Sequence, residues 1–183
     1  MSKKIEKVAV LGAGIMGAQI AGHLANAGVP SLLFDISNDL AEKGKSSLNT
    51  LKPAPLYNPK KVDLIQACSY ESDINKLKDA DWILEAVVEK IAIKEKVYAT
   101  IIPHIKDSAI LSSNTSGIPL SDLTKSFPDE LASRFLVTHF FNPPRYMQLL
   151  ELIRGQKTSD ETYNTMVDFG ESTLGKGIVH AKD

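Results

Sequence analysis

A histidine and a glutamate stand at equal distances from the middle of a proline-containing turn. Two apolar runs, near residues 134–140 and 147–153, flank the sequence Phe-Phe-Asn-Pro-Pro-Arg that ends at Arg145. If these runs pair as a hairpin centred near Arg145, His139 faces Glu151 across the strands. A carboxylate bonded to one imidazole nitrogen leaves the other free to exchange a proton with a substrate. The pair therefore predicts either a general base with its orienting carboxylate or a buried histidine with a structural carboxylate.

Hydroxyl and amide side chains follow another expected strand, near residues 109–113. The sequence there is Ser-Ser-Asn-Thr-Ser-Gly, from Ser112 to Gly117. In open α/β sheets, ligands bind at the carboxyl ends of the strands. These side chains are suited to bond a substrate oxygen, or alternatively to cap a helix that begins near Pro119.

Carboxylates end a third expected strand, near residues 82–87. Glu85 and Glu89 lie at its end, and Lys94 comes one turn into the helix that follows. One interpretation places Glu89 and Lys94 at the edge of a bound cofactor. The other is an acidic helix N-terminus with an exposed lysine.

A glycine-rich segment connects the first apolar run, near residues 5–11, to a helical stretch. Residues 12–17 read Gly-Ala-Gly-Ile-Met-Gly. Gly12 permits a tight strand-to-helix turn, Gly14 lets backbone N–H groups reach a pyrophosphate, and Gly17 lets helix and strand pack closely. With Gly28 as the expected helix cap, this context predicts a dinucleotide-binding βαβ unit.

Asp35 ends the second apolar run, near residues 30–35. A carboxylate at this place accepts hydrogen bonds from ribose hydroxyls and repels a 2′-phosphate. The sequence therefore favours NAD over NADP.

Apolar runs alternate with amphipathic stretches along the whole chain, which predicts an α/β fold of the doubly wound, Rossmann type. Its mostly parallel sheet is expected to include an antiparallel C-terminal strand. A helix predicted over residues 91–105 should turn Ile93, Val97, Ile101 and Ile105 toward the sheet. The proline-rich stretch 52–59 is expected to be an irregular surface connector.

Length and composition narrow the remaining choices. The 183 residues suit one domain, 1–183, and a net charge of −1 without a basic run argues against nucleic acid. The sequence contains neither an apolar stretch long enough for a bilayer nor a signal peptide, which predicts a cytoplasmic protein without a membrane partner. The single cysteine, Cys68, has no partner for a disulfide and belongs to no metal-binding motif.

Four motifs together resemble the L-3-hydroxyacyl-CoA dehydrogenase family over nearly the whole chain. They are the glycine segment 12–17, Glu-Ala-Val-Val-Glu at 85–89, Ser-Asn-Thr-Ser at 113–116 and His-Phe-Phe-Asn-Pro-Pro at 139–144. Glu151 also stands at the family's spacing. The resemblance implies oxidation of an acyl-CoA substrate with hydride transfer to NAD, as in fatty-acid β-oxidation.

The resemblance also implies roles for individual residues. His139 is then the general base, Glu151 orients it, and Ser116 and Asn142 position the substrate oxygen beside the nicotinamide. The implied cofactor contacts are Gly12, Gly14, Ile15, Met16, Gly17, Asp35, Glu89, Lys94, Ser116 and Asn142.

In the sequence of these motifs, the chain is most similar to multifunctional β-oxidation proteins, in which a hydratase domain belongs to the same polypeptide. In the family, a helical domain follows a sequence like that of residues 181–183, closes the acyl-CoA site and usually forms a dimer. We therefore expect this chain to be the cofactor domain only, without the family's helical C-terminal domain. Its expected partners are such a helical domain, a fused or associated hydratase, and further copies in a homo-oligomer. The alternatives are a dinucleotide-binding module without turnover and a dehydrogenase of a small 3-hydroxy acid.

Overall fold

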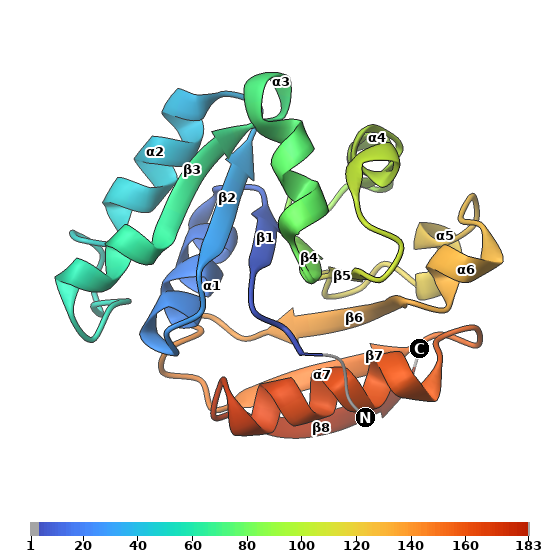
Figure 1. The fold of residues 1–183 in the computed structure, drawn as a ribbon. Coiled ribbons are helices and arrows are strands. Elements are labelled where there is room, and N and C mark those ends of the chain that lie inside the picture. Colours follow the sequence, from blue (N-terminus) through green and yellow to red (C-terminus); the bar gives the residue numbers. More distant parts are fainter. Residues whose placement is uncertain (1–3, 183) are drawn as a thin grey trace.

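One sheet of eight strands, with helices on both faces, forms the frame of the protein (Figure 1). The computed structural model describes residues 4–182. The strands are β1 (Val8–Leu11), β2 (Ser31–Asp35), β3 (Ile65–Ser69), β4 (Trp82–Glu85), β5 (Ile110–Ser113), β6 (Phe135–Phe140), β7 (Leu149–Arg154) and β8 (Gly177–Lys182). The α-helices are α1 (Ile15–Asn26), α2 (Asn38–Ser47), α3 (Tyr70–Asp73), α4 (Ile91–Ile101), α5 (Leu120–Leu123), α6 (Asp129–Ala132) and α7 (Asp160–Ser172). Short 3₁₀ helices are η1 (Pro59–Leu64), η2 (Ile74–Asp79) and η3 (Ile102–His104).

The strand order is β3-β2-β1-β4-β5-β6-β7-β8. Strands β1 to β6 are parallel, β7 pairs antiparallel with β6, and β8 runs parallel to β7. From β1 the chain continues to β2 on one side of β1, and β4 later pairs with β1 on its other side. The connections from β1 and β4 therefore diverge, which leaves a crevice at the carboxyl ends of these strands. This arrangement confirms the predicted doubly wound, Rossmann-type sheet.

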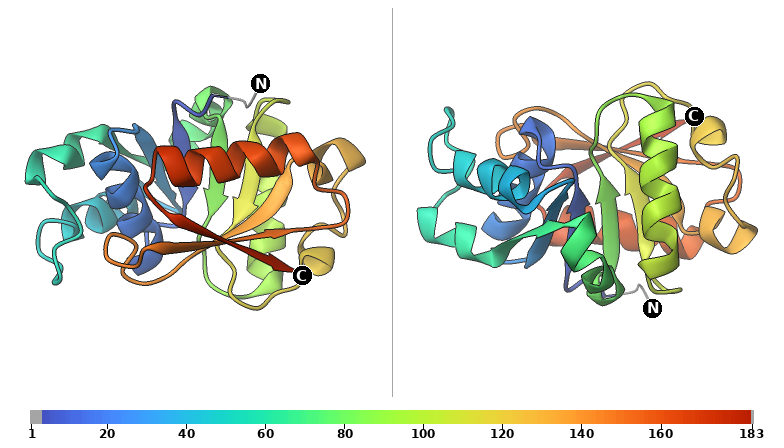
Figure 2. Two further views of the ribbon diagram at one scale, coloured as in Figure 1. Left: turned by 90° about the horizontal axis from the view of Figure 1, so that it is seen from below. Right: turned by 90° about the horizontal axis from the view of Figure 1, so that it is seen from above.

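Both faces of the sheet are buried because successive side chains of a strand point to opposite faces. Val8 and Val10 belong to one core cluster, whereas Ala9 and Leu11 belong to the other, and all four are 0% exposed. Helices α1, α2 and α7 contribute to the first cluster, and α4, α5 and α6 to the second. In Figure 2 the view from below shows α7 in front of the sheet, and the view from above shows α4.

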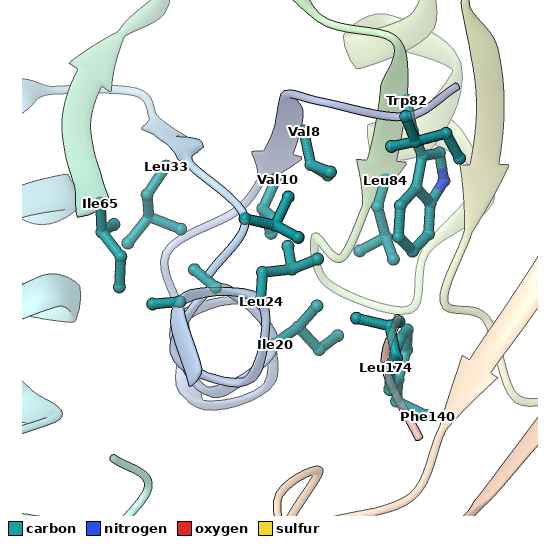
Figure 3. Close-up of a cluster of buried hydrophobic side chains, with 14 of the residues drawn as sticks. Val8, Val10, Ile20, Leu24, Leu33, Ile65, Trp82, Leu84, Phe140 and Leu174 are labelled. Carbon is teal, nitrogen blue, oxygen red and sulfur yellow. The ribbon is translucent and has the colours of Figure 1, made fainter. Parts of the chain in front are cut away.

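Helix α1 is fixed between the glycine segment and β2. It ends at Asn26, and the chain then turns at Gly28, whose φ of +81° suits glycine, while the N–H of Val29 donates to the Leu24 carbonyl at 2.9 Å. Ile20 and Leu24 point from α1 toward Val10 and the neighbouring strands (Figure 3). The predicted cap at Gly28 is confirmed.

Strand β3 is the main element that the sequence pattern did not predict. It pairs only with β2, at the edge of the sheet, and its second residue, Gln66, is exposed. Its short, mixed polar and apolar sequence gives no clear strand pattern. The stretch 52–58 contains neither helix nor strand, as predicted, although η1 begins at Pro59.

The predicted inner face of the helix after β4 is partly wrong. Ile101 is fully buried, and Val97 and Ile105 are partly buried against the core, but Ile93 is 38% exposed. The face turned inward carries Lys94 and Tyr98 with Ile101 instead. A buried carboxylate described below binds the first two of these side chains, so the apolar periodicity alone was misleading.

No helix within residues 4–182 is long and apolar enough to cross a bilayer. In that same part of the chain, no group of three or more His, Cys, Asp or Glu side chains is placed to hold a metal ion. Cys68 is a buried free thiol, and burial raises its pKa to about 11.

Candidate active site

A cleft of about 610 Å³ lies at the carboxyl ends of the central strands, where the strand order reverses. Most of the sequence-predicted cofactor residues line it: Gly12, Gly14, Ile15, Met16, Asp35, Glu89 and Ser116. Among the other apolar side chains that line it, three large ones are exposed and had not been marked for the cofactor from the sequence: Ile36, 75% exposed, Val88, 57%, and Ile93, 38%. Exposed apolar side chains around one cleft indicate a surface that a ligand or another protein segment covers.

Gly12, in the turn after β1, and Gly17, in the first turn of α1, are required by backbone conformation and close packing. Gly12 has a φ of +100°, and a Cβ on Gly17 would lie 1.8 Å from the Gly12 carbonyl oxygen. A Cβ on Gly14, by contrast, would meet no protein atom within 4 Å. The open space at Gly14, where α1 begins, fits the approach of a pyrophosphate to the helix N-terminus. The described residues therefore fit a dinucleotide.

Asp35 lies beside this turn, at the end of β2. Its two carboxylate oxygens accept hydrogen bonds from the backbone N–H groups of Ala13, at 2.8 Å, and Ile36, at 2.7 Å. These bonds fix the carboxylate at the rim of the cleft, and it remains partly exposed there. Contact with a ribose stays a prediction.

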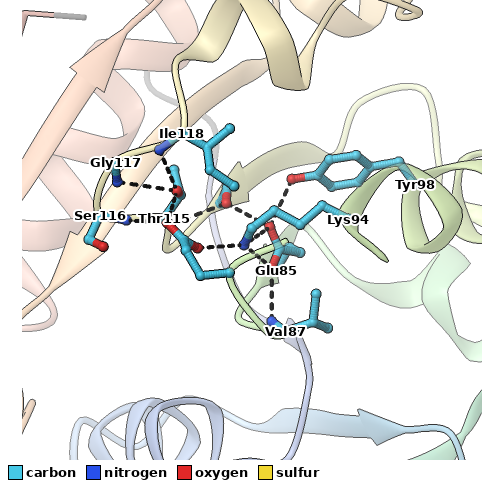
Figure 4. A network of polar contacts seen from close by, with 10 residues as sticks. Glu85, Val87, Lys94, Tyr98, Thr115, Ser116, Gly117 and Ile118 are labelled. Carbon is cyan, nitrogen blue, oxygen red and sulfur yellow. Dashed lines mark hydrogen bonds and ion pairs between the residues drawn. The ribbon is translucent and has the colours of Figure 1, made fainter. Parts of the chain in front are cut away.

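A buried ion pair supports the floor of the site (Figure 4). Glu85, 0% exposed at the end of β4, lies 2.8 Å from the ammonium of Lys94, and it also accepts bonds from the hydroxyls of Tyr98, at 2.9 Å, and Ser113, at 2.6 Å. The backbone N–H of Val87 adds a further bond at 2.8 Å. A buried carboxylate needs such partners, and burial together with Glu85 raises the pKa of Tyr98 well above its usual range.

Lys94 is buried, so the interpretation as an exposed lysine is wrong. Its side chain is 1% exposed, and its Nζ also lies 3.2 Å from a carboxylate oxygen of Glu89. Lys94 is absent from the lining of the cleft, whereas Glu89 is part of it. The structure shows Lys94 in contact with Glu89. A direct contact of Lys94 with NAD stays a prediction.

Glu89 connects this ion pair to the loop after β5. It accepts hydrogen bonds from the Thr115 hydroxyl and from the Ser116 backbone N–H, the latter at 3.0 Å. Burial alone would raise the pKa of Glu89, but the bonds from Thr115, Lys94 and Ser116 lower it below the usual range. An ionised Glu89 thus holds the loop that carries Ser116.

The loop after β5 does not cap the next helix, so that alternative is wrong. Helix α5 begins after Pro119 without a side-chain cap, and the Thr115 oxygen accepts from the Ile118 N–H at 3.1 Å inside the loop. Asn114, which sequence analysis had assigned no separate role, lines the cleft and accepts a bond from the Phe140 N–H at 2.9 Å. Asn114 therefore ties the cleft to the strand that carries His139.

His139 and Glu151 are direct partners in the antiparallel pair of β6 and β7, as predicted. Nδ1 of His139 lies 2.8 Å from Oε2 of Glu151, and the two side chains are 21% and 30% exposed. A carboxylate accepts, so Nδ1 carries the proton, and in the neutral imidazole Nε2 is then the nitrogen with the free lone pair. The pair has the geometry of a base and its orienting carboxylate.

Asn142 follows β6 and contacts the first helix. Its side-chain oxygen accepts a hydrogen bond at 3.3 Å from Gln19, a buried residue of α1 that sequence analysis missed. None of the hydrogen bonds among residues 4–182 joins Asn142 to Ser116. Their shared contact with a substrate oxygen stays a prediction.

The family model described as "3-hydroxyacyl-CoA dehydrogenase, NAD binding domain" matches residues 7–183. The chain belongs to this dehydrogenase family. A Bacillus subtilis protein named "Probable 3-hydroxyacyl-CoA dehydrogenase" is 43% identical over 204 residues, which cover 100% of this chain and 26% of that protein. A Deinococcus radiodurans protein of the same name is 43% identical over 187 residues, covering 98% of this chain and 54% of that protein.

Solved structures of the family have the same fold. Mycobacterium tuberculosis FadB2 superposes with a TM-score of 0.87 at 32% identity, covering 99% of this chain and 65% of that one. The (S)-3-hydroxybutyryl-CoA dehydrogenase of Ralstonia eutropha gives 0.84 at 32% identity, with 98% and 64% covered. The chain thus spans 26% and 54% of the two curated relatives, and it corresponds to the part of the family that binds NAD.

Proposed function

We propose that the chain serves an enzyme that oxidises L-3-hydroxyacyl-CoA to 3-ketoacyl-CoA, with His139 as the general base. The observation that carries the proposal is the 2.8 Å contact between His139 Nδ1 and Glu151 Oε2. It occurs on a strand that Asn114 ties to the dinucleotide cleft. This arrangement supports proton removal close to a bound nicotinamide.

In this proposal, the chain's own residues divide the work of binding. When bound, NAD accepts the hydride from C3 of the substrate. The turn at Gly14 leaves room for the pyrophosphate, and Asp35 accepts hydrogen bonds from the ribose. Glu89 holds the loop that carries Ser116, and Ile36 and Val88 cover apolar surface of the ligand.

His139 and Glu151 move the proton. Nε2 of His139 takes the proton of the 3-hydroxyl group as the hydride leaves C3, and Glu151 stabilises the imidazolium that results. Ser116 and Asn142 hold the substrate oxygen. A general base placed in this way contributes about 10²- to 10⁴-fold in rate.

We also propose that residues 1–183 act as one NAD-binding domain beside further domains. In support, a Rickettsia felis protein named "Putative fatty acid oxidation complex trifunctional enzyme" is 42% identical over 190 residues, covering 100% of this chain and 26% of that protein. A helical domain would complete the acyl-CoA site, and a hydratase would act in the same chain or complex.

Oxidation of NADH that depends on acetoacetyl-CoA tests the proposal, in the native protein that carries this chain. NADPH and free acetoacetate serve as controls. We expect turnover with NADH and the CoA ester alone. Turnover with free acetoacetate would favour a dehydrogenase of small 3-hydroxy acids, and NADH binding without turnover would favour a binding module.

A further inference from the structure

Lys176 is a buried lysine in the connection between α7 and β8. The residue is 5% exposed, and none of the described carboxylates forms an ion pair with it. Its ammonium donates instead to the main-chain carbonyls of Pro144 and Met147, the latter at 2.6 Å, and lies 6.0 Å from the centre of the Phe140 ring. Burying an ammonium without hydrogen-bond partners costs free energy, so these carbonyl acceptors stabilise the buried charge of Lys176.

Both carbonyls belong to the turn 141–148, which joins β6 to β7. Within the turn, the N–H groups of Tyr146 and Met147 each donate to the Pro143 carbonyl at 3.0 Å. The turn thus satisfies two of its own N–H groups, and Lys176 binds two of its carbonyls from outside. The turn connects the two strands that carry His139 and Glu151.

The turn also has a contact on its other side. Gln19, 7% exposed in α1, donates to the Asn142 side-chain oxygen at 3.3 Å. This bond occupies the oxygen of Asn142 and leaves its Nδ2 as the donor available to a ligand. The orientation of Asn142 therefore depends on where the turn is held.

A second buried side chain of α1 faces Lys176 without neutralising it. The Nε2 atom of His23 lies 3.2 Å from the Leu174 carbonyl, which only accepts, so Nε2 carries the proton. Burial first, and then the charge of Lys176, lower the pKa of His23 to about 4. His23 is therefore neutral near pH 7, and the charge of Lys176 is balanced by the carbonyls of the turn and the Phe140 ring.

We propose that Lys176 is a positioning residue, whose ammonium fixes the turn 141–148 so that Asn142 meets the substrate beside the His139–Glu151 pair. Lys176 itself touches neither member of that pair in the hydrogen bonds described. The catalytic part of this inference rests on the proposed function, whereas the positioning of the turn does not.

Amide hydrogen exchange of this chain tests the positioning without any activity. Lys176→Met keeps the length of the side chain and removes its charge and donors. We expect the amides of Tyr146 and Met147 to exchange at least about tenfold faster, while those of Leu150 and Leu152 in β7 keep their protection. Lys157→Met, at an exposed lysine, is the matched control and should change none of them. Unchanged exchange at Tyr146 and Met147 in a folded Lys176→Met variant would overturn the proposal.

A measurement on the unaltered chain covers the case in which Lys176→Met does not fold. Nitrogen-15 NMR of the lysine ammonium groups reports how fast their protons exchange with water. We expect the Lys176 ammonium to exchange at least about tenfold more slowly than that of Lys157. Equal rates would show that the ammonium is not held by the turn and would overturn the proposal.

A double-mutant cycle in the native protein tests the catalytic part. In the parent protein, we expect Lys176→Met to lower kcat about tenfold and to change NADH affinity less than about twofold. In the Asn142→Ala background, the same change should lower kcat by less than about twofold. If Lys176→Met lowered kcat by the same factor in the parent and in the Asn142→Ala background, Lys176 would not act through Asn142, and the proposal would be overturned. A parent protein without turnover would instead contradict the proposed function and would leave the exchange results to decide the positioning.

Discussion

Glu85 and Lys94 form an ion pair in the interior, with 2.8 Å between Oε1 and Nζ and side chains that are 0% and 1% exposed. The pair lies where α4 packs under the ends of β4 and β5, and through Glu89 it reaches the loop of Ser116. Buried pairs of this kind add little net stability, yet they are costly to break. We therefore infer that the pair orients the residues at the floor of the cleft.

Lys94→Met should destabilise the protein strongly, because it leaves the Glu85 carboxylate buried without its cation. We expect a loss of about 3–5 kcal/mol in the free energy of unfolding, measured by urea denaturation. The control is Lys96→Met, an exposed lysine of the same helix, which should change the value by less than about 0.5 kcal/mol. In the double variant Glu85→Gln/Lys94→Met, part of the lost stability should return. A double variant as unstable as the sum of its single changes would contradict the pairing.

Gly14→Ala and Gly17→Ala should have opposite consequences. The Cβ at Gly14 points into open space, so we expect the unfolding free energy to change by less than about 1 kcal/mol and NADH affinity to fall at least about tenfold. At Gly17 the Cβ collides with the Gly12 carbonyl, so the folded state itself should be lost or strongly destabilised. Thermal unfolding and NADH titration separate the two effects. Normal NADH affinity in Gly14→Ala would remove this turn from the cofactor site.

Asp35→Asn should change the choice between the two nicotinamide cofactors. The variant keeps the shape of the side chain and removes the charge that repels a 2′-phosphate, so we expect the preference for NADH over NADPH to narrow about tenfold. Dissociation constants of both reduced cofactors check this. Asp39→Asn, at an exposed carboxylate in the first turn of α2, should leave the preference as it is. The same preference in Asp35→Asn as in the parent would argue against a contact with the ribose.

The buried His23 predicts a loss of stability in mild acid. The unfolded chain takes up a proton near pH 6.5, whereas burial and Lys176 keep the pKa of the folded state at about 4. The unfolded state therefore binds more protons between these values, so the contribution of His23 to the unfolding free energy is fully present above pH 6.5 and is lost as the pH drops toward 4. The fall amounts to roughly 3 kcal/mol.

His23→Gln retains a donor for the Leu174 carbonyl and should flatten this pH dependence in urea titrations between pH 7 and pH 4. The control is His104→Gln, a partly exposed histidine in η3, which should keep the parent's slope. An equally steep fall in His23→Gln would assign the acid sensitivity to other groups.

Local features of the fold could be predicted from the sequence. The turn at Gly12, the helix cap at Gly28 and the register of His139 with Glu151 each depend on residues close in the chain, so the pattern contained the information. Strand β3 could not be predicted in the same way, because its pairing with β2 rather than its own composition makes it a strand.

The missed site residues depend on contacts between distant segments. Gln19 meets Asn142 across 123 positions, and nothing near either residue marks that contact. Lys94 appeared to belong to an exposed helix face, because the carboxylate that draws it inward belongs to another element. From the sequence, Ile36 and Val88 cannot be told from apolar core residues, because only the fold shows that they are exposed at the cleft.

The most direct test of the account is the kcat of His139→Asn for the oxidation of NADH by acetoacetyl-CoA, measured beside NADH binding. The change removes the basic Nε2 and keeps a side chain of moderate size. We predict a loss of at least about 100-fold in kcat, with NADH affinity within about twofold of the parent and with His104→Asn unaffected. A kcat for His139→Asn equal to that of the parent would contradict the assignment of His139 as the general base.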